Sequence, residues 1–325
     1  MKIDRTKIII GLVVLAIFQI CILIFTDLFS SQNIKSNQIQ KSLIKNLKKE
    51  SIVFFSIKDS QDIFSLEKDS EGWTVKKEDG NKMPGNISKI DSYLETIINI
   101  PRGIVVNNGD DENIGKEFGF DDLRQQELVI NTSNKKEYKI QIGSTGSKNN
   151  SSYIKFGKEK AIREVNSNIS TRTSYQAIDW ANKNIFNNLN LVDIASCEID
   201  SNFDWYNGIY KIVHRDSTSD IKGEYLIEIN DNITTVDNSD KLSSIIEKII
   251  GTTVAEYKFG EITNKKKMGT IKFILKNGSS LSLNLFNADK DDIANFIITT
   301  DFNDYKYLIH EDTAKNIFKN YKDFE

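Results

Sequence analysis

Few side chains in this chain have the chemistry and the spacing that catalysis or metal binding would need. The two histidines, His214 and His310, fall in different predicted strands and lack the His-x-x-x-His spacing with which one helix presents two ligands to a metal ion. Ser42 stands three residues before Lys45, and Ser56 two residues before Lys58, but the supporting motifs of a Ser–Lys hydrolase do not accompany either pair. We therefore predict no catalytic residues and no enzyme activity.

Metal, nucleotide and nucleic-acid sites are not expected either. A calcium loop places oxygen ligands at alternating positions around a central glycine, and the acidic clusters at 110–112 and 289–292 do not follow that pattern. The sequence has no Gly-x-x-x-x-Gly-Lys-Ser/Thr loop for a nucleotide phosphate. Its formal net charge of −3 gives no basic excess for a nucleic acid. We predict no metal, no cofactor, no nucleotide and no nucleic-acid partner.

The three tryptophans are candidates for stacking on a ligand such as a sugar ring. Trp73 lies in an alternating strand pattern and Trp180 in an apolar helical pattern, so we expect both to pack in a core. Trp205 and its neighbour Tyr206 lie in a segment without clear periodicity. We therefore take Trp205 and Tyr206 as the candidate contacts with a ligand or partner.

An apolar run at residues 8–25, from Ile8 to Phe25, is broken only by Gln19. As a helix it would span roughly 27 Å, close to the ~30 Å hydrocarbon core of a bilayer. Lys2, Arg5 and Lys7 precede it, and such basic flanks stay in the cytoplasm. We expect a single-pass anchor in the cytoplasmic membrane at 1–29, with the N-terminus cytoplasmic and the body extracytoplasmic, periplasmic or at the cell surface.

Two alternatives to a permanent anchor remain open. A cleaved signal peptide would have a shorter apolar centre followed by a small-residue cleavage site. Lipidation at Cys21 would require the apolar stretch to close there, whereas Ile22 continues it and the bulky Ile20 precedes the cysteine. The uncleaved anchor is the interpretation that the sequence favours.

The rest of the chain predicts a polar helical linker at 30–50 and two tandem copies of one α+β unit, at 51–190 and 191–325. Alternating apolar and polar residues indicate mainly antiparallel sheets with one buried face. A constant offset of 143 residues aligns the apolar strand positions of the copies, for example Leu128 with Ile271, Tyr153 with Phe296 and Val165 with Leu308. We expect helices at 90–100 and 240–250 to cover one sheet each. The predicted fold class is therefore α+β, with one N-terminal transmembrane helix before two duplicated domains.

Several segments of the first copy resemble a known family, the domain of unknown function 4340. The resemblance rests on 72–75, the helix at 90–98, Phe118-Gly119-Phe120, the strand that ends at Gly143, and 152–154 followed by 162–165. It covers about residues 52–186, and the second copy looks like a diverged repeat. The resemblance implies a membrane-anchored bacterial protein, in some members linked to ABC transporters of the gliding-motility type. It carries over no catalytic residues.

These observations lead to three functional hypotheses. The first is a non-enzymatic accessory or scaffold protein that stands beside an ABC-type transporter or another envelope assembly. The alternative is a protein that binds envelope glycan or peptidoglycan through aromatic side chains around Trp205 or in the cleft between the copies. The third is an envelope hydrolase, which would require a cluster of Ser, Asp or Glu that converges only in the folded chain.

The predicted topology can be tested by proteolysis of spheroplasts. Protease added outside should digest the chain beyond about Ser30 and leave a short stub protected by the membrane. Replacing Leu15 by Lys and Phe18 by Arg should impair insertion, because each charge costs roughly 2.5–3.5 kcal/mol at the centre of a membrane helix. Protection of the body in intact spheroplasts, with cleavage only by a cytoplasmic protease, would show that the orientation is wrong.

Overall fold

The computed structural model describes residues 42–109, 112–187, 189–215, 224–230, 232–234 and 239–324. The predicted anchor at 8–25 and the first part of the predicted linker lie outside these ranges. No helix within the described residues has the length and apolar character needed to cross a membrane.

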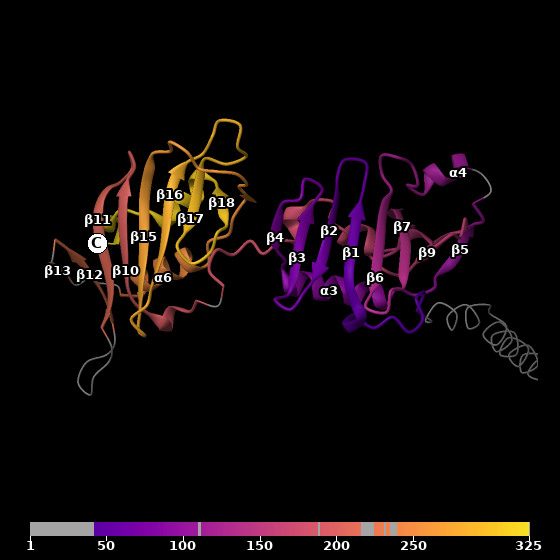
Figure 1. Ribbon diagram of the computed structural model, residues 1–325, viewed down its shortest axis with the longest axis horizontal. Coiled ribbons are helices and arrows are strands. Elements are labelled where there is room, and N and C mark those ends of the chain that lie inside the picture. The colour runs from indigo at the N-terminus through magenta and orange to yellow at the C-terminus, as the bar shows by residue number, and fades with distance from the viewer. Residues whose placement is uncertain are drawn as a thin grey trace, which may run out of the picture. The chain divides into compact units, whose positions relative to one another are not determined.

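Two nine-stranded antiparallel sheets dominate the described chain (Figure 1). The first has the order β4-β3-β2-β1-β6-β7-β8-β9-β5. Its strands are β1 (Ile52–Lys58), β2 (Ile63–Lys68), β3 (Trp73–Lys77), β4 (Lys82–Pro84), β5 (Ile104–Asn107), β6 (Gln126–Thr132), β7 (Glu137–Thr145), β8 (Ser152–Phe156) and β9 (Ile162–Val165). Its helical segments are η1 (Lys49–Ser51), α3 (Ile87–Ile98), α4 (Glu112–Glu117), α5 (Ile169–Arg172) and η2 (Ala177–Trp180).

The second sheet has the order β13-β12-β11-β10-β15-β16-β17-β18-β14. Its strands are β10 (Ile194–Asn202), β11 (Asn207–Arg215), β12 (Glu224–Ile229), β13 (Asn232–Thr234), β14 (Glu256–Tyr257), β15 (Lys267–Leu275), β16 (Ser280–Asn287), β17 (Phe296–Thr300) and β18 (Lys306–Ile309). The helical segments are η3 (Leu191–Asp193), α6 (Ser239–Ile250), α7 (Glu311–Ile317) and η4 (Tyr321–Phe324). The chain divides into two compact units: the first holds the described residues up to Glu78 with Ile87–Ala177, and the second holds Asp79–Asn86 with the residues from Ile178 onward.

The two sheets repeat one topology. In each sheet, the first four strands along the chain are followed by a 12-residue helix, α3 or α6. The next strand, β5 or β14, then lies at the edge of the sheet beside its last strand, β9 or β18. Even an irregularity recurs: the register shifts between Ile52 and Phe54 where β1 pairs with β6, and between Ile194 and Ser196 where β10 pairs with β15. A β-bulge of this kind bends a strand at a defined place. Its recurrence at corresponding positions supports the internal repeat that the sequence predicts.

The predicted constant offset of 143 residues holds for β6 and β7 against β15 and β16, but not for the strands that follow them. Leu128 pairs with Ile140, and Ile271 with Leu283, so both strands keep that offset. Ile142 then pairs with Ile154 of β8, whereas its counterpart Leu285 pairs with Ile298 of β17. Ile154 and Ile298 are 144 positions apart, so the offset between β8 and β17 is 144. Tyr153 therefore corresponds to Ile297 and Val165 to Ile309, not to Phe296 and Leu308. The β16–β17 connection is longer than the β7–β8 connection, and a register shift between Ile142 and Thr145 in β7 offsets part of this difference.

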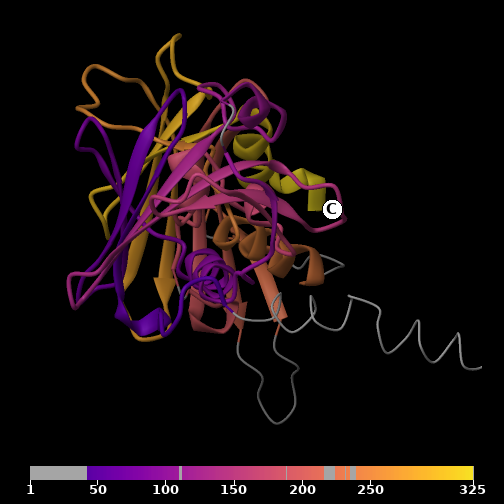
Figure 2. The same ribbon diagram turned by 90° about the vertical axis from the view of Figure 1, so that its right-hand side faces the viewer.

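Each unit buries the alternating apolar residues of its strands beneath one helix. In the first unit Phe55, Leu128 and Ile130 are fully buried, and the ring of Phe55 lies 5.9 Å from that of Tyr93 on α3. Figure 2 shows α3 beside its sheet from the end of the first unit. On α6, the buried residues Leu242, Ile245, Ile246 and Ile249 repeat the spacing of Ile90, Tyr93, Leu94 and Ile97 on α3. This i, i+3, i+4, i+7 spacing forms the apolar stripe of an amphipathic helix.

The structure contains less helix than the sequence predicts. The fold is mostly β, and the apolar helical pattern around Trp180 forms only the four-residue 3-10 segment η2. The described end of the predicted linker, 42–48, contains no helix, because Leu43 donates its backbone N–H to Ile100 O at 2.7 Å and Ser42 bridges to Pro101. Ile44 and Leu47 are buried there. Tertiary pairing has replaced the local helical preference of this segment.

The family-like segment Phe118-Gly119-Phe120 forms a tight corner against β7. Ser144 donates its backbone N–H to Phe118 O at 2.9 Å. Gly119 has a φ of +82°, and a side chain on Gly143 would come within 2.3 Å of the same carbonyl oxygen. Only residues without a side chain allow this close approach of two backbones. The corner is therefore a structural feature of the first unit.

Candidate functional site

Trp205 and Tyr206, the predicted contact residues, belong to an aromatic cluster of the second unit. Trp205 is half-buried, stacks on Phe203 with the ring centroids 4.0 Å apart, and donates its indole N–H to Phe318 O at 3.2 Å. The ammonium group of Lys315 lies 5.5 Å from its ring. Tyr206 is buried, and burial raises the pKa of its hydroxyl to about 12. The two residues attach the C-terminal segment to the sheet, and Trp205 remains partly exposed. Trp73 and Trp180 are buried, as predicted.

The other residues with chemical potential do not converge. His214 is half-buried in β11 beside Tyr225, whereas His310 is exposed at the start of α7. The Ser42 hydroxyl donates to Ile98 O at 2.9 Å. Across the described residues, no three or more His, Cys, Asp or Glu side chains are grouped so that they could hold a metal ion.

Lysines occupy the acidic cluster at 289–292. Lys258 pairs with Asp292 at 2.5 Å and with Asp289 at 3.4 Å, and Lys265 also pairs with Asp289. The hydrogen bond from Lys265 and, secondarily, that from Lys258 lower the pKa of Asp289. This cluster therefore ties loops together. Of the other acidic cluster, residues 110 and 111 lie outside the described residues.

The fold brings together one serine–carboxylate cluster that the sequence does not reveal. Glu164, on β9, is 8% exposed, and its Oε1 accepts hydrogen bonds from Ser147 Oγ at 2.8 Å, Ser151 Oγ at 2.8 Å and Lys148 N at 3.2 Å. The two serines come from the β7–β8 loop. This is the kind of convergence that a hydrolase would require, although the three partners lie up to 17 positions apart in the chain.

The chemistry of this cluster fits loop anchoring better than nucleophilic catalysis. Burial alone raises the pKa of Glu164, but hydrogen bonds from Ser151, Ser147 and Lys148 outweigh it and lower the pKa overall. A carboxylate with a lowered pKa is a weak general base. Ser151 is also only 1% exposed, so substrate could not reach its hydroxyl. The carboxylate holds the β7–β8 loop closed.

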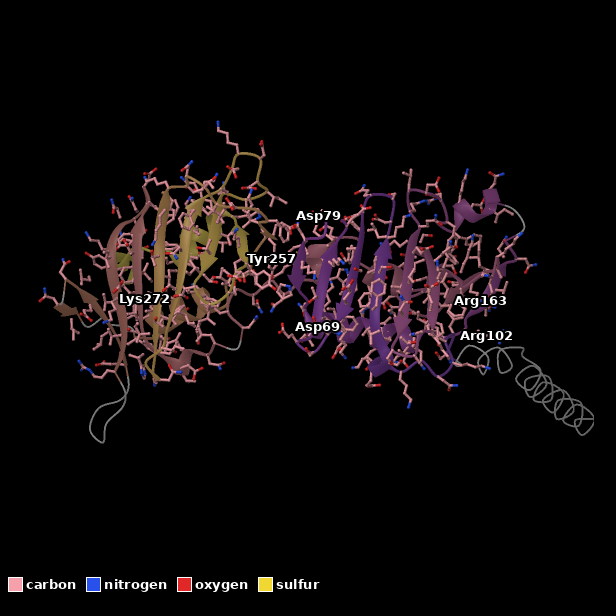
Figure 3. All side chains as sticks on the ribbon, viewed as in Figure 1. Asp69, Asp79, Arg102, Arg163, Tyr257 and Lys272 are labelled. Atoms are coloured by element: carbon pink, nitrogen blue, oxygen red, sulfur yellow. The ribbon has the colours of Figure 1, made fainter. Side chains whose placement is uncertain are left out.

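A pocket lined by aromatic and amide side chains lies in the second unit and has a volume of about 300 Å³. Tyr257 (labelled in Figure 3), Tyr305 and Tyr307 line one part of it, with ring centroids between 5.2 and 6.4 Å apart. Phe186 and Phe302 line another part, 5.4 Å apart. Side chains of Asn184, Asn187 and Asn303 add amide groups to the lining. Aromatic walls with a few amides are typical of sites for small polar ligands.

Hydrogen bonds fix the geometry of this aromatic–amide pocket. The Tyr257 hydroxyl donates to Asn182 O at 2.6 Å, and the Tyr307 hydroxyl donates to Asn303 Oδ1 at 3.2 Å. Burial raises the pKa of both hydroxyls, to about 12 for Tyr307, so both stay neutral at physiological pH. Tyr305, by contrast, is 37% exposed. The pocket therefore combines a rigid floor with an accessible aromatic rim.

The sequence does not reveal this pocket, because its residues come from separate segments of the chain. Residues 184–187, Leu189, β14, the start of β16 and the approach to β18 each contribute to the lining. The available signal was the alternation of Tyr305 and Tyr307, which places both rings on one face of a strand. Nothing in the sequence indicated that Tyr257 would join them.

Comparison with known proteins places the chain in a family. The model of the domain of unknown function DUF4340 matches residues 78–272, which is more than half of the chain. The chain belongs to the DUF4340 family. No curated protein matches it, and no solved structure does. The DUF4340 match includes the Phe118-Gly119-Phe120 corner and Glu164, but it ends before Phe302, Tyr305 and Tyr307.

The Glu164 cluster predicts a pH-dependent contribution to stability. Its pKa is lower in the folded chain than the ~4.3 of an unfolded glutamate, so the stabilisation is present above about pH 4.3 and is lost as the pH falls through the folded pKa. Glu164→Gln should lower the free energy of unfolding by about 1–3 kcal/mol at pH 7, because hydrogen bonds to a charged group are lost. The difference from wild type should shrink below pH 4 in urea unfolding followed by circular dichroism.

Glu67→Gln is the matched control for that experiment. Glu67 is half-exposed and lies 3.8 Å from Lys76. Exposed pairs contribute little, so this change should stay within ~0.5 kcal/mol. Equal effects of the two substitutions, or no effect of pH on the Glu164 difference, would contradict a special role for the cluster.

Proposed function

We propose that the chain is a single-pass membrane-anchored accessory or scaffold protein with an extracytoplasmic body and no catalysis of its own. It would stand beside an ABC-type transporter or another envelope assembly. The observation that carries this proposal is the repeated β scaffold. Where its polar side chains converge, as at Ser151 and Glu164 or at Lys258 and Asp292, they hold loops together. Two similar units in tandem offer broad sheet faces and edges to partners. The apolar run at 8–25 supplies the proposed attachment to the membrane.

The accessory role predicts partners that depend on the membrane anchor. Mild crosslinking in intact cells, followed by purification of the full chain, should recover a transporter subunit or another envelope protein. A matched chain with Leu15→Lys and Phe18→Arg should lose that partner, because the charges impair insertion and remove the body from the membrane surface. Recovery of the wild-type chain as a free monomer, without an envelope partner, would contradict the proposal.

Envelope glycan or peptidoglycan is the second candidate, and the aromatic–amide pocket favours it. The apolar face of a sugar ring packs against an aromatic ring, and sugar hydroxyls exchange hydrogen bonds with amides. Tyr305 at the rim would supply the stacking ring, and the amides of Asn184 and Asn187 would supply the hydrogen bonds. A volume of about 300 Å³ is at the lower end for small-ligand sites and suits one or two sugar rings. In this proposal the pocket, and not the predicted contact Trp205, holds the glycan.

Glycan binding predicts a difference between two exposed tyrosines. Titration of the detergent-solubilised full chain with chitotetraose should give saturable heat by calorimetry. Tyr305→Ala should weaken binding about fivefold, because it removes a stacking surface worth about 1 kcal/mol. Tyr175→Ala, at a 51% exposed tyrosine outside the pocket, should change it less than twofold. Absence of saturable heat together with no co-sedimentation on intact sacculi would exclude the candidate.

A further inference from the structure

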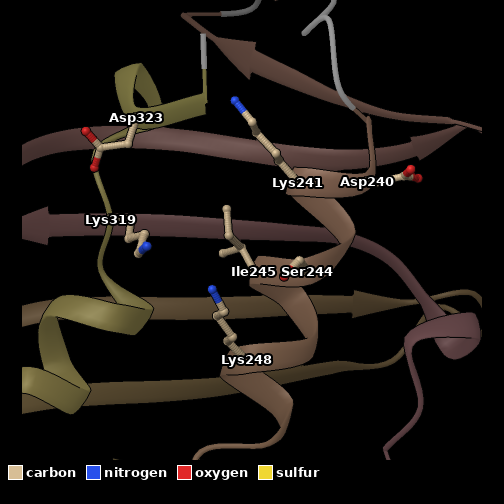
Figure 4. A pocket seen from close by; sticks show the side chains of 7 residues that line it. All are labelled: Asp240, Lys241, Ser244, Ile245, Lys248, Lys319 and Asp323. Atoms are coloured by element: carbon tan, nitrogen blue, oxygen red, sulfur yellow. The ribbon is translucent and has the colours of Figure 1, made fainter.

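A second cavity lies in the second unit between α6 and the segment that follows α7 (Figure 4). Its volume is about 340 Å³. Its lining residues are Asp240, Lys241, Ser244, Ile245, Lys248, Lys319 and Asp323. Three of these seven side chains are lysines, and they come from two separate segments of the chain. We refer to this cavity as the lysine pocket.

The lysine pocket is lined by three lysines and two aspartates, Asp240 and Asp323, so positive charge is in excess. Figure 4 shows Lys248 and Lys319 on opposite sides of the gap, Lys241 at its rim, and Asp240 turned away on the other side of α6. Among the described residues, no carboxylate forms an ion pair within 4.0 Å with any of the three lysines. Positive charges held near one another repel, and an anion between them removes that repulsion.

The first unit provides an internal comparison, because α3 and α6 occupy the same place in the repeat. Their buried residues align when Ile87 is matched with Ser239, which matches Ser92 with Ser244 and Thr96 with Lys248. In the first unit, Arg172 of α5 donates to Ser92 Oγ at 2.6 Å and to Thr96 Oγ1. The chain therefore closes this helix surface with its own cation. In the second unit the helix itself carries the cation, Lys248, and a cavity is left in front of it.

Ile245 adds an apolar element to the lysine pocket. It takes the position of Tyr93, whose hydroxyl in the first unit hydrogen-bonds to Thr173 Oγ1 at 2.7 Å. That polar link between the two helices has no counterpart at Ile245. The exchange leaves an apolar floor surrounded by ammonium groups and the Ser244 hydroxyl. Such a floor suits the carbon atoms next to an anionic group.

We propose that the lysine pocket binds a phosphate group carried by a small ligand or a lipid headgroup. Lysine ammonium groups bind phosphate as point charges, without the fixed fork geometry that arginine provides. Three of them can surround the phosphate oxygens while the Ser244 hydroxyl donates a further hydrogen bond. A cavity of about 340 Å³ holds a headgroup-sized molecule. This site is separate from the aromatic–amide pocket and does not depend on glycan binding.

The test measures phosphate binding by the full chain in a zwitterionic detergent. One arm uses sn-glycerol 3-phosphate, and the other uses dihexanoyl phosphatidylglycerol below its micelle concentration, both by titration calorimetry at low salt. The triple variant Lys241→Gln, Lys248→Gln and Lys319→Gln should weaken binding at least tenfold. The control triple Lys266→Gln, Lys272→Gln and Lys290→Gln removes the same charge from exposed positions of the second unit (Lys272 is labelled in Figure 3) and should change binding less than twofold.

Each outcome decides the proposal. Binding in both arms that only the pocket triple abolishes supports recognition of the phosphate itself. Binding of the short-chain lipid alone, again lost only in the pocket triple, identifies a lipid headgroup as the source, and binding of glycerol phosphate alone identifies a free phosphate ester. Equal weakening by the two triples would reduce the effect to net charge and overturn the site, as would the absence of saturable binding to wild type in both arms. Unchanged melting temperatures of both triples would show that folding is intact.

Discussion

The structure depends on one constraint: a twisted antiparallel sheet must cover one of its faces, and each unit has a single 12-residue helix with which to do it. Each fully buried aliphatic or aromatic side chain contributes roughly 1.5–3 kcal/mol, so the stripe on α3 or α6 and the strand residues beneath it supply much of the driving force. A one-residue slip in any strand would turn its apolar set toward solvent. The register is therefore set by burial, and the recurring bulge marks where each first strand bends to fit.

The two copies share one scaffold but differ in the side chains that cover its helix surface and loops. The first unit closes the junction between α3 and α5 with hydrogen bonds from Arg172 and between Tyr93 and Thr173. The second has Lys248 and Ile245 at the matching helix positions and leaves the lysine pocket. The first unit also carries the Glu164 cluster, whereas the second carries the aromatic–amide pocket. Duplication thus supplied a common core, and the loops and helix surfaces diverged, because they are not held by the packing of the sheet.

Membership of a family of unknown function does not by itself assign a role, because function depends on the chemistry of particular sites. The serine–carboxylate cluster illustrates the distinction. Its residue types resemble those of a hydrolase. The burial of Ser151 and the lowered pKa of Glu164, however, fit a carboxylate that holds the β7–β8 loop in place. The two pockets have the opposite character, since exposed aromatic or cationic side chains remain available at their openings. Such openings leave room for the ligands that we propose.

The sequence by itself determined the strands with strict alternation, the two amphipathic helices and the internal repeat, because these depend on local periodicity. It could not determine the short edge strands β4, β5 and β14, the non-helical path of 42–48 or the one-residue shift at β8 and β17. Those features follow from pairing between distant segments. Only the tertiary structure brought Ser151 to Glu164, Tyr257 to Tyr305, and Lys319 to Lys248. The physical reason is that a site takes its residues from whichever loops and strand ends the sheet order brings together, and that order is a property of the whole unit.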